Sequence, residues 1–251
     1  MRFNLLENPN PLWLNQVSML GTLLNIATVI CGSLLGMLLA GRFPERVRQT
    51  IISGLGLFTL GLGVQMFLKT ENILIVLGSL LVGALLGEWW KIEEGLQSLG
   101  QLLERKLMRG GSADQLRFVR GFLTASLLFC VGPMAILGSI DAGLTGNIQI
   151  LAVKATLDGF ASLAFASSLG IGVMFSILPL LVYQGGITLL AGQVQAVVSP
   201  QMMTEMSATG GLILMAIAVS SLLEIKPIRA GNFLPALVIA PGLVAILALF
   251  R

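Results

Sequence analysis

Long apolar segments, repeated along the whole chain, constrain the fold of this protein more than any other feature. A helix needs about 20 mostly apolar residues to cross a bilayer, and only a helix or a closed barrel satisfies its own backbone there. The sequence therefore predicts an all-α, polytopic membrane helical bundle with about eight transmembrane helices. The expected spans are residues 20–40, 51–68, 73–87, 118–140, 148–165, 171–190, 208–223 and 233–250.

The polar composition agrees with a lipid environment. Only 11% of the residues are charged and the mean hydropathy is +0.92, whereas about a quarter of the residues in a soluble domain are charged. A soluble chain of this composition would lack the polar residues that cover a surface, so the expected partner is the lipid bilayer. No basic cluster with interleaved aromatics is present, and we expect no nucleic-acid partner.

Positive charges are distributed unevenly between the expected spans. If the N-terminus lies outside, the inside loops hold eleven: Arg42, Arg46, Arg48, Lys91, Arg105, Lys106, Arg109, Arg117, Arg120, Lys226 and Arg229. The outside segments hold three: Arg2, Lys69 and Arg251. Because cytoplasmic loops carry the excess of Lys and Arg, this split predicts that both termini lie outside the cytoplasm.

The charge count does not place one hairpin. The turn near residues 167–170 carries no charge, so the 165–190 hairpin either crosses fully or re-enters, which would leave six or seven full spans. We expect residues 1–18 to form an N-terminal leader, with Trp13 at the headgroup level, and residues 19–251 to form a single transmembrane domain.

Residues 91–108 carry a different pattern. Their leucines recur at helical spacing with charged residues off that stripe, which predicts a cytoplasmic amphipathic helix outside the hydrocarbon core. Three placements remain open for it: against its own bundle, on the membrane surface, or on a partner protein.

Thirty glycines are many for a helical chain, and several stand at the small-xxx-small spacing of helix contacts in lipid. The clearest pairs are Gly32 with Gly36 and Gly83 with Gly87. We expect these faces to pack helices together, and a homo-oligomer would use similar faces.

Lys154 and Asp158 are the main candidates for function. They stand four residues apart and so share one helix face, with Asp158 about 12 to 15 Å deep at 1.5 Å per residue. A charge at that depth costs about 2.5 to 3.5 kcal/mol, and intramembrane ionisable residues usually line pathways. The structural alternative is a Lys154 side chain that reaches the interface and an Asp158 that caps a helix broken at Gly159.

Other polar and helix-breaking residues complete the predicted pathway. Gly132 and Pro133 interrupt the fourth span, and Pro179 precedes Gln184 in the sixth. Two discontinuous helices near the midplane are a common basis for a transport site, while a simple proline kink is the alternative. The weaker candidates are Asn25, Gln65, Asp141 and Asn147, of which the last two are better suited to capping helices.

Several motifs resemble the bacterial YdfK/YqgA family of multi-spanning membrane proteins, catalogued as a domain of unknown function. The similar segments are residues 129–138 (FCVGPMAILG), 154–159 (KATLDG), 165–172 (FASSLGIG), 184–189 (QGGITL) and 231–237 (GNFLPAL), and the resemblance runs from about residue 19 to the end. It implies a protein of the bacterial inner (plasma) membrane. It implies no established activity, substrate or catalytic residue.

These observations lead to two hypotheses. The first is a transporter or channel for a small solute or ion, in which Asp158 is the protonation or ion-coupling site, Lys154 its charge partner and Gln184 part of the path. The alternative is a non-transporting scaffold or assembly protein that binds partners through its glycine-rich faces. The chain has no histidine and no intramembrane protease motif, so we expect no enzyme, no cofactor and no metal site. Substrate and coupling ion stay open.

Overall fold

The computed structural model describes residues 11–40, 44–107 and 112–249, and these are helical throughout apart from turns, with no strand. The prediction of an all-α membrane bundle is confirmed. The elements, with η marking 3₁₀ or π segments, are α1 (Pro11–Ala40), α2 (Glu45–Phe67), α3 (Ile73–Trp90), α4 (Ile92–Leu107), α5 (Ser112–Cys130), α6 (Pro133–Thr145), α7 (Gln149–Leu169), η1 (Ile171–Ser176), α8 (Ile177–Leu180), η2 (Leu181–Gly185), α9 (Gly186–Leu189), α10 (Ala191–Val197), α11 (Pro200–Ile217), η3 (Ala218–Leu222), η4 (Ala230–Phe233) and α12 (Ala236–Ala248).

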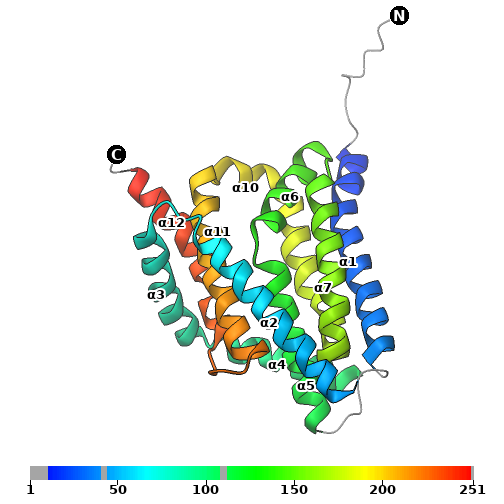
Figure 1. Ribbon diagram of the computed structural model, residues 1–251. Helices are drawn as coiled ribbons and strands as arrows, with labels where there is room; N and C mark the ends of the chain where they lie inside the picture. Colours follow the sequence, from blue (N-terminus) through cyan, green and yellow to red (C-terminus); the bar gives the residue numbers. More distant parts are fainter. Residues whose placement is uncertain (1–10, 41–43, 108–111, 250–251) are drawn as a thin grey trace, which may run out of the picture.

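The long helices stand side by side, and α1 begins at the same end of the bundle at which α12 ends (Figure 1). We call this the terminal end. The opposite end, here called the basic end, holds the turns from α1 to α2, from α3 through α4 to α5, from α7 to η1 and from η3 to η4. Most described Lys and Arg residues lie in those turns or in the helices next to them: Arg46, Arg48, Lys91, Arg105, Lys106, Arg117, Arg120, Lys226 and Arg229.

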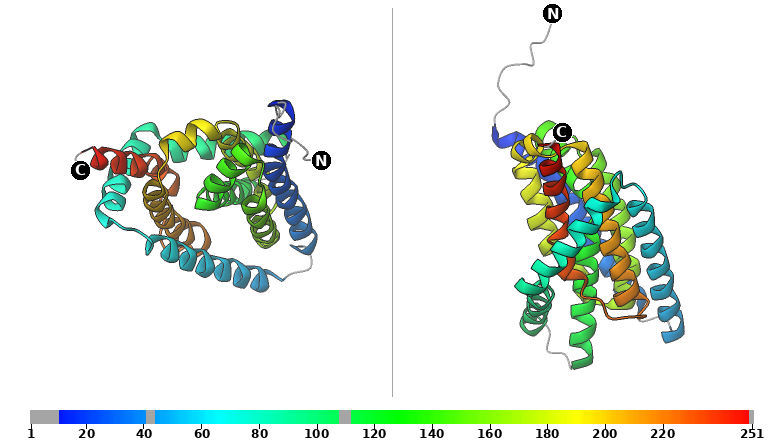
Figure 2. Two further views of the ribbon diagram at one scale, coloured as in Figure 1. Left: turned by 90° about the horizontal axis from the view of Figure 1, so that it is seen from above. Right: turned by 90° about the vertical axis from the view of Figure 1, so that its left-hand side faces the viewer.

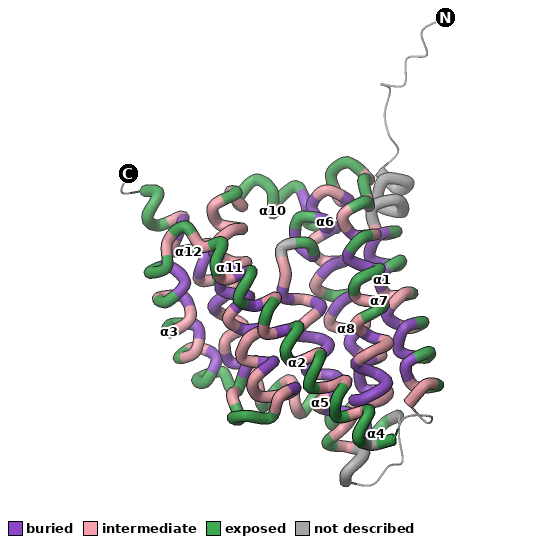
Figure 3. Tube along the Cα trace, viewed as in Figure 1, coloured by how far each residue is buried: buried purple, intermediate pink, exposed green. Residues whose placement is uncertain are grey.

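The helices pack in pairs, with α1 on α7, α2 on α11, α3 on α12 and α5 on η1. Helix α2 crosses the bundle obliquely (Figure 2). Buried residues line the inside of the bundle, while the outer faces of α2 and α3 are exposed (Figure 3). In the described residues, seven helices are long and apolar enough to cross a membrane, and there are eight spans if the bent pair α5 and α6 counts as one.

The fourth span is broken where the sequence predicts. Its two halves, α5 and α6, meet at an angle of 59°. Gly132 has extended backbone (φ 177°) and Pro133 occupies the first turn of α6. Proline favours that position because it lacks a backbone N–H and cannot continue the preceding turn. The break therefore follows from two adjacent residues.

The uncharged hairpin runs the full length of the bundle. Segment η1 packs on α5, and α9 and α10 pack on α6, so the hairpin accompanies both halves of the broken span. The re-entrant alternative is not observed. The sixth span also differs from expectation, because Pro179 and the Gly185–Gly186 pair do not unwind it. It runs continuously through 3₁₀, α and π segments.

Glycines bring several backbones into direct contact, as the small-residue spacing predicts. A Cβ on Gly32 would lie 2.1 Å from the Gly159 carbonyl oxygen, and one on Gly36 would lie 2.2 Å from that of Leu163. On α3, a Cβ on Gly87 would lie 1.9 Å from the Asn232 oxygen. In contrast, Gly61 on α2 has no protein atom near its Cβ position.

The amphipathic helix appears as α4 and packs on its own bundle. Its Gly100 lies against Phe122 and Val119 of α5, so the first of the three placements is observed, and the last residue predicted for it, Met108, lies outside the described residues. Helix α1 already begins at Pro11. The second half of the predicted leader is therefore part of α1, and residues 1–10 lie outside the described residues.

The glycine contacts can be tested with a matched pair of substitutions. We expect Gly32→Ala to lower the free energy of unfolding by about 1–3 kcal/mol, since the methyl group meets an immovable backbone oxygen. Gly61→Ala should raise it by about 0.5–1 kcal/mol, because alanine is the better helix former and nothing opposes it. Denaturant titration in mixed micelles, followed by tryptophan fluorescence, measures both. Equal effects of the two substitutions would contradict the α1–α7 contact.

Candidate functional site

Lys154 and Asp158 form an ion pair inside the bundle, one turn apart on α7. The Lys154 residue is only 6% exposed, so its side chain does not reach the interface. Helix α7 continues unbroken through Gly159 to Leu169, so Asp158 does not cap a helix end. Neither part of the structural alternative is observed. The Lys154 side chain is 7% exposed and that of Asp158 is 13% exposed, so both charges lie largely inside the bundle and form a pair.

Two amides from other helices join this pair. The Asn25 Nδ2 of α1 donates to Asp158 Oδ2 at 2.9 Å and to Gln184 Oε1 of η2 at 3.1 Å. Asn25 and Gln184 are completely buried. Four residues named from the sequence thus meet in one cluster, here called the Lys154–Asp158 cluster: Asn25, Lys154, Asp158 and Gln184.

Gln184 is presented by an irregular stretch of helix. Residues 181–185 form a π segment. The Thr188 hydroxyl, one turn further along in α9, donates to the Gln184 carbonyl at 2.9 Å. Single π turns are rare in proteins overall, and those that occur are often found at functional sites. The sixth span is therefore continuous, and its irregularity is a π segment at the residue that completes the cluster.

The broken fourth span ends beside the same cluster. The Lys154 ammonium lies 6.0 Å from the centre of the Phe129 ring, in the last turn of α5, within the range of a cation–π interaction. A cavity of about 10 Å³ adjoins the break, between Cys130, Gly132 and Tyr183. That is about the space of one water molecule, so no preformed chamber for a larger solute opens here.

Several buried polar side-chain atoms of the described residues have no hydrogen-bond partner in the protein. They include Asn25 Oδ1 and Gln184 Nε2 within the cluster, Thr22 Oγ1 and Ser139 Oγ on the side of the terminal end, and Ser33 Oγ, Ser126 Oγ and Ser176 Oγ on the side of the basic end. Buried polar groups are usually hydrogen-bonded, and each one left alone costs about 1–3 kcal/mol. These atoms can therefore accept or donate bonds to water, an ion or a polar solute.

The remaining sequence candidates lie at different places. Gly132 borders the small cavity, Pro133 starts α6, and Pro179 is half-buried in α8. Gln65 is exposed on α2, away from the cluster. Asn147 accepts from the Gln149 N–H at the start of α7, as a capping residue would, while Asp141 accepts from Asn147 and Thr145.

Sequence reasoning missed a buried carboxylate at the terminal end. Glu205, on α11, is completely buried and accepts from the Thr70 hydroxyl (2.6 Å) and from the backbone N–H groups of Glu71 (2.8 Å) and Asn72 (3.0 Å). The expected seventh span begins only at residue 208, but Ser199 caps α11 and Pro200 begins it. The Ser-Pro pair is the signal that would have moved the helix start.

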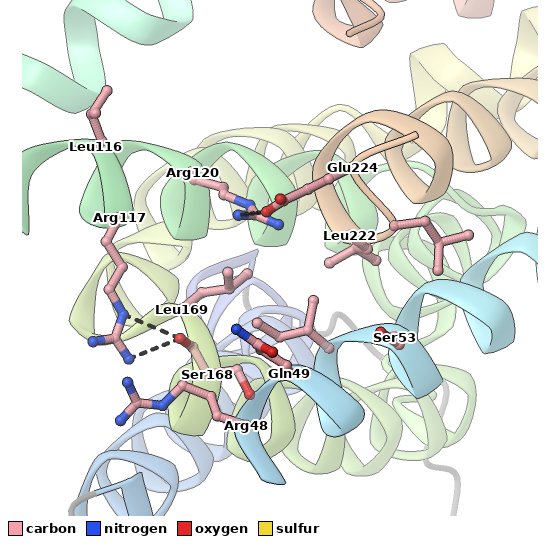
Figure 4. A pocket seen from close by; sticks show the side chains of 12 residues that line it. Arg48, Gln49, Ser53, Leu116, Arg117, Arg120, Ser168, Leu169, Leu222 and Glu224 are labelled. Atoms are coloured by element: carbon pink, nitrogen blue, oxygen red, sulfur yellow. Dashed lines mark hydrogen bonds and ion pairs between the residues drawn. The ribbon is translucent and has the colours of Figure 1, made fainter. Parts of the chain in front are cut away.

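Two arginines on α5 were also missed as structural partners. Arg117 donates to the Ser168 carbonyl in the last turn of α7, and Arg120 donates to the Ser221 carbonyl in η3 and pairs with Glu224 (Figure 4). Carbonyls at helix C-termini lack intrahelical partners and favour nearby cations. The sequence showed these arginines only as loop charges.

Asn232 explains the 231–237 motif. Its Oδ1 accepts from the Glu93 N–H at 2.7 Å and its Nδ2 donates to Glu88 at 2.6 Å, while Glu93 accepts from the Gly231 N–H at 2.8 Å. This exchange joins η4 to the junction of α3 and α4. The motif therefore has a structural role, separate from the cluster.

The Glu205 contacts lead to a stability prediction. We expect Glu205→Gln to lower the free energy of unfolding by on the order of 2 kcal/mol, because its amide NH₂ would meet hydrogen-bond donors. The exposed Glu71→Gln in the same turn is the control and should change stability by less than about 0.5 kcal/mol. Denaturant titration of both variants checks this, and a silent Glu205→Gln would contradict the described hydrogen bonds.

The Lys154–Asp158 ion pair leads to a second stability prediction. Lys154→Met or Asp158→Leu alone should lower the free energy of unfolding by about 3–5 kcal/mol, because each leaves a charge without its partner inside the bundle. The double variant should lower it by less than either single variant. The exposed pair Lys91 and Glu94 provides a matched cycle with little coupling. Unfolding titrations of both cycles measure the coupling, and additive effects at Lys154 and Asp158 would show that the pair is not formed.

Comparison with known proteins places the chain in a family. Residues 20–245 match the family described as Protein of unknown function (DUF554). The uncharacterized protein YqgA of Escherichia coli K12 is 34% identical over 229 residues, covering 90% of this chain and 96% of that protein. The uncharacterized membrane protein YdfK of Bacillus subtilis 168 is 28% identical over 236 residues, covering 92% and 98%. No solved structure matches. The chain therefore belongs to the DUF554 family of membrane proteins of unknown function.

Proposed function

We propose that the protein is a transporter or channel for a small polar solute or ion, with Asp158 as its protonation or ion-coupling site and Lys154 as the charge partner. One observation carries this proposal. The buried Lys154–Asp158 pair is joined through Asn25 to Gln184 beside the broken fourth span and the π segment of the sixth.

The energetic argument favours function over packing. Ionisable groups inside a membrane are costly and usually mark pathways or proton relays. Irregular helices near the middle of a bundle are a recurring basis for transport sites. Here both irregular segments border the charged pair, which a purely structural ion pair does not require.

The buried polar atoms without protein partners extend this argument along the bundle. Thr22 and Ser139 lead from the cluster toward the terminal end, and Ser33, Ser126 and Ser176 lead toward the basic end. Because the cavity at the break has a volume of only about 10 Å³, passage of anything larger than water requires a rearrangement. Transport with alternating access meets that requirement.

The charge distribution supports an orientation. The positive-inside rule would put the basic end in the cytoplasm of a bacterial inner membrane, and α1 would begin and α12 would end outside. We propose no catalytic step. A homo-oligomer remains part of the proposal.

Flux in proteoliposomes tests the role of Asp158. We expect the wild-type protein to move at least one probe: protons against a trapped pH dye, alkali cations, simple anions, or small neutral solutes followed by light scattering. Asp158→Asn should reduce that flux to the level of empty liposomes, because the titratable group is lost while the shape is kept. Asp141→Asn, on α6 and bonded to Thr145 and Asn147 near the turn to α7, is the matched control and should keep wild-type flux.

The double variant Lys154→Met with Asp158→Leu is the control that separates loss of transport from misfolding, since it leaves no unpaired charge. It should insert normally and show no flux. Wild-type flux in either Asp158 variant would contradict the assigned role. A wild-type protein that moves none of these probes above empty liposomes would count against transport itself.

A further inference from the structure

The basic end of the bundle holds a cleft that is separate from the Lys154–Asp158 cluster. Its volume is about 580 Å³, within the range of small-molecule sites. Helices α2 and α5, the last turn of α7 and the η3 region form its walls. Its polar lining consists of Arg48, Gln49, Ser53, Arg117, Arg120, Ser168 and Glu224.

Arginine dominates the charge of this lining. The lining holds three guanidinium groups and one carboxylate, that of Glu224, which is 64% exposed and already pairs with Arg120. Arg48 comes from α2 and Arg117 from α5, and their guanidinium groups lie on the same side of the cleft (Figure 4). Planar guanidinium forks match the oxygens of a phosphate group better than an ammonium does.

The guanidinium groups on α5 are held in place before any ligand arrives. Arg117 donates through both Nε and Nη2 to the Ser168 carbonyl, and Arg120 donates in the same way to that of Ser221. A side chain already fixed loses less entropy on binding. Arg48 on the neighbouring helix is held too, because its Nη2 donates to the Ala40 carbonyl at 3.3 Å. The cleft is therefore lined by three guanidinium groups that the protein already holds in place.

The rest of the lining is apolar, with Ile52, Leu116, Leu169, Leu222 and Leu223. The cleft lies where α2 and α5 begin and where α7 and η3 end, at the boundary between the apolar spans and the charged turns. We propose that this cleft binds a phosphate group, carried by an anionic lipid or free in solution, between Arg48 on α2 and the two arginines of α5. The site is independent of the transport proposal, because it shares no residue with the cluster.

Binding to the purified full-length protein in phosphate-free buffer tests this site with two probes. Phosphatidylglycerol is titrated and counted by native mass spectrometry, and inorganic phosphate is titrated by calorimetry. We expect Arg48→Gln to raise the dissociation constant of whichever probe binds by about tenfold, because one charge-assisted contact is lost. Arg46→Gln is the matched control: it removes the same charge from the same helix, is exposed and does not line the cleft, so binding should not change.

Saturable binding of phosphatidylglycerol alone would identify a lipid headgroup, and saturable binding of inorganic phosphate would identify a free anion. Binding of neither probe overturns the proposal. Equal losses in Arg46→Gln and Arg48→Gln also overturn it, because they would mean a diffuse attraction to the basic end. If Arg48→Gln fails to fold, Gln49→Glu places a carboxylate in the lining and should weaken binding similarly, while Gln195→Glu in the exposed α10 should not.

Discussion

The close approach of α1 and α7 is the contact on which the rest of the interior depends. In lipid, helices are held by packing and interhelical hydrogen bonds because hydrophobic exclusion is absent. Asn25, Thr28, Gly32 and Gly36 recur at helical spacing along one face of α1 and all meet α7. Thr28 donates to the Ala155 carbonyl at 2.7 Å. Without the two glycines, the Asn25 amide would not reach Asp158.

One buried and one largely buried carboxylate, Glu205 and Asp158, have very different partners. Glu205 accepts three hydrogen bonds from one turn and fixes the connection between α2 and α3. Asp158 is held by Lys154 and Asn25, and the amides around it keep an unsatisfied oxygen and an unsatisfied nitrogen. The first arrangement is complete within the protein. The second has bonding capacity left over, which is the physical difference between a structural and a candidate binding site.

Sequence periodicity predicted the spans, the amphipathic helix and the break at Gly132 and Pro133 because each depends on local properties: apolar length, a repeated stripe, and a residue without an N–H. The Lys154–Asp158 pairing was predictable for the same reason, as a spacing of four on one helix. The partnership with Asn25 and Gln184 was not, since it depends on which helices touch. Glu205, Arg117 and Arg120 were missed because their partners are backbone groups of distant turns, which leave no pattern in the sequence.

The irregular segments of the interior border the same residues. The break between α5 and α6 ends next to Phe129 and Lys154, and the π segment begins three residues before Gln184. In contrast, α1 and α7 pass the cluster as unbroken helices. Regular helices hold Asn25, Lys154 and Asp158 in fixed register, whereas the irregular ones place polar groups that a regular turn would direct elsewhere. Two regular helices thus face two irregular ones at Asp158, and we expect a change in the partners of Asp158 to move the irregular segments first.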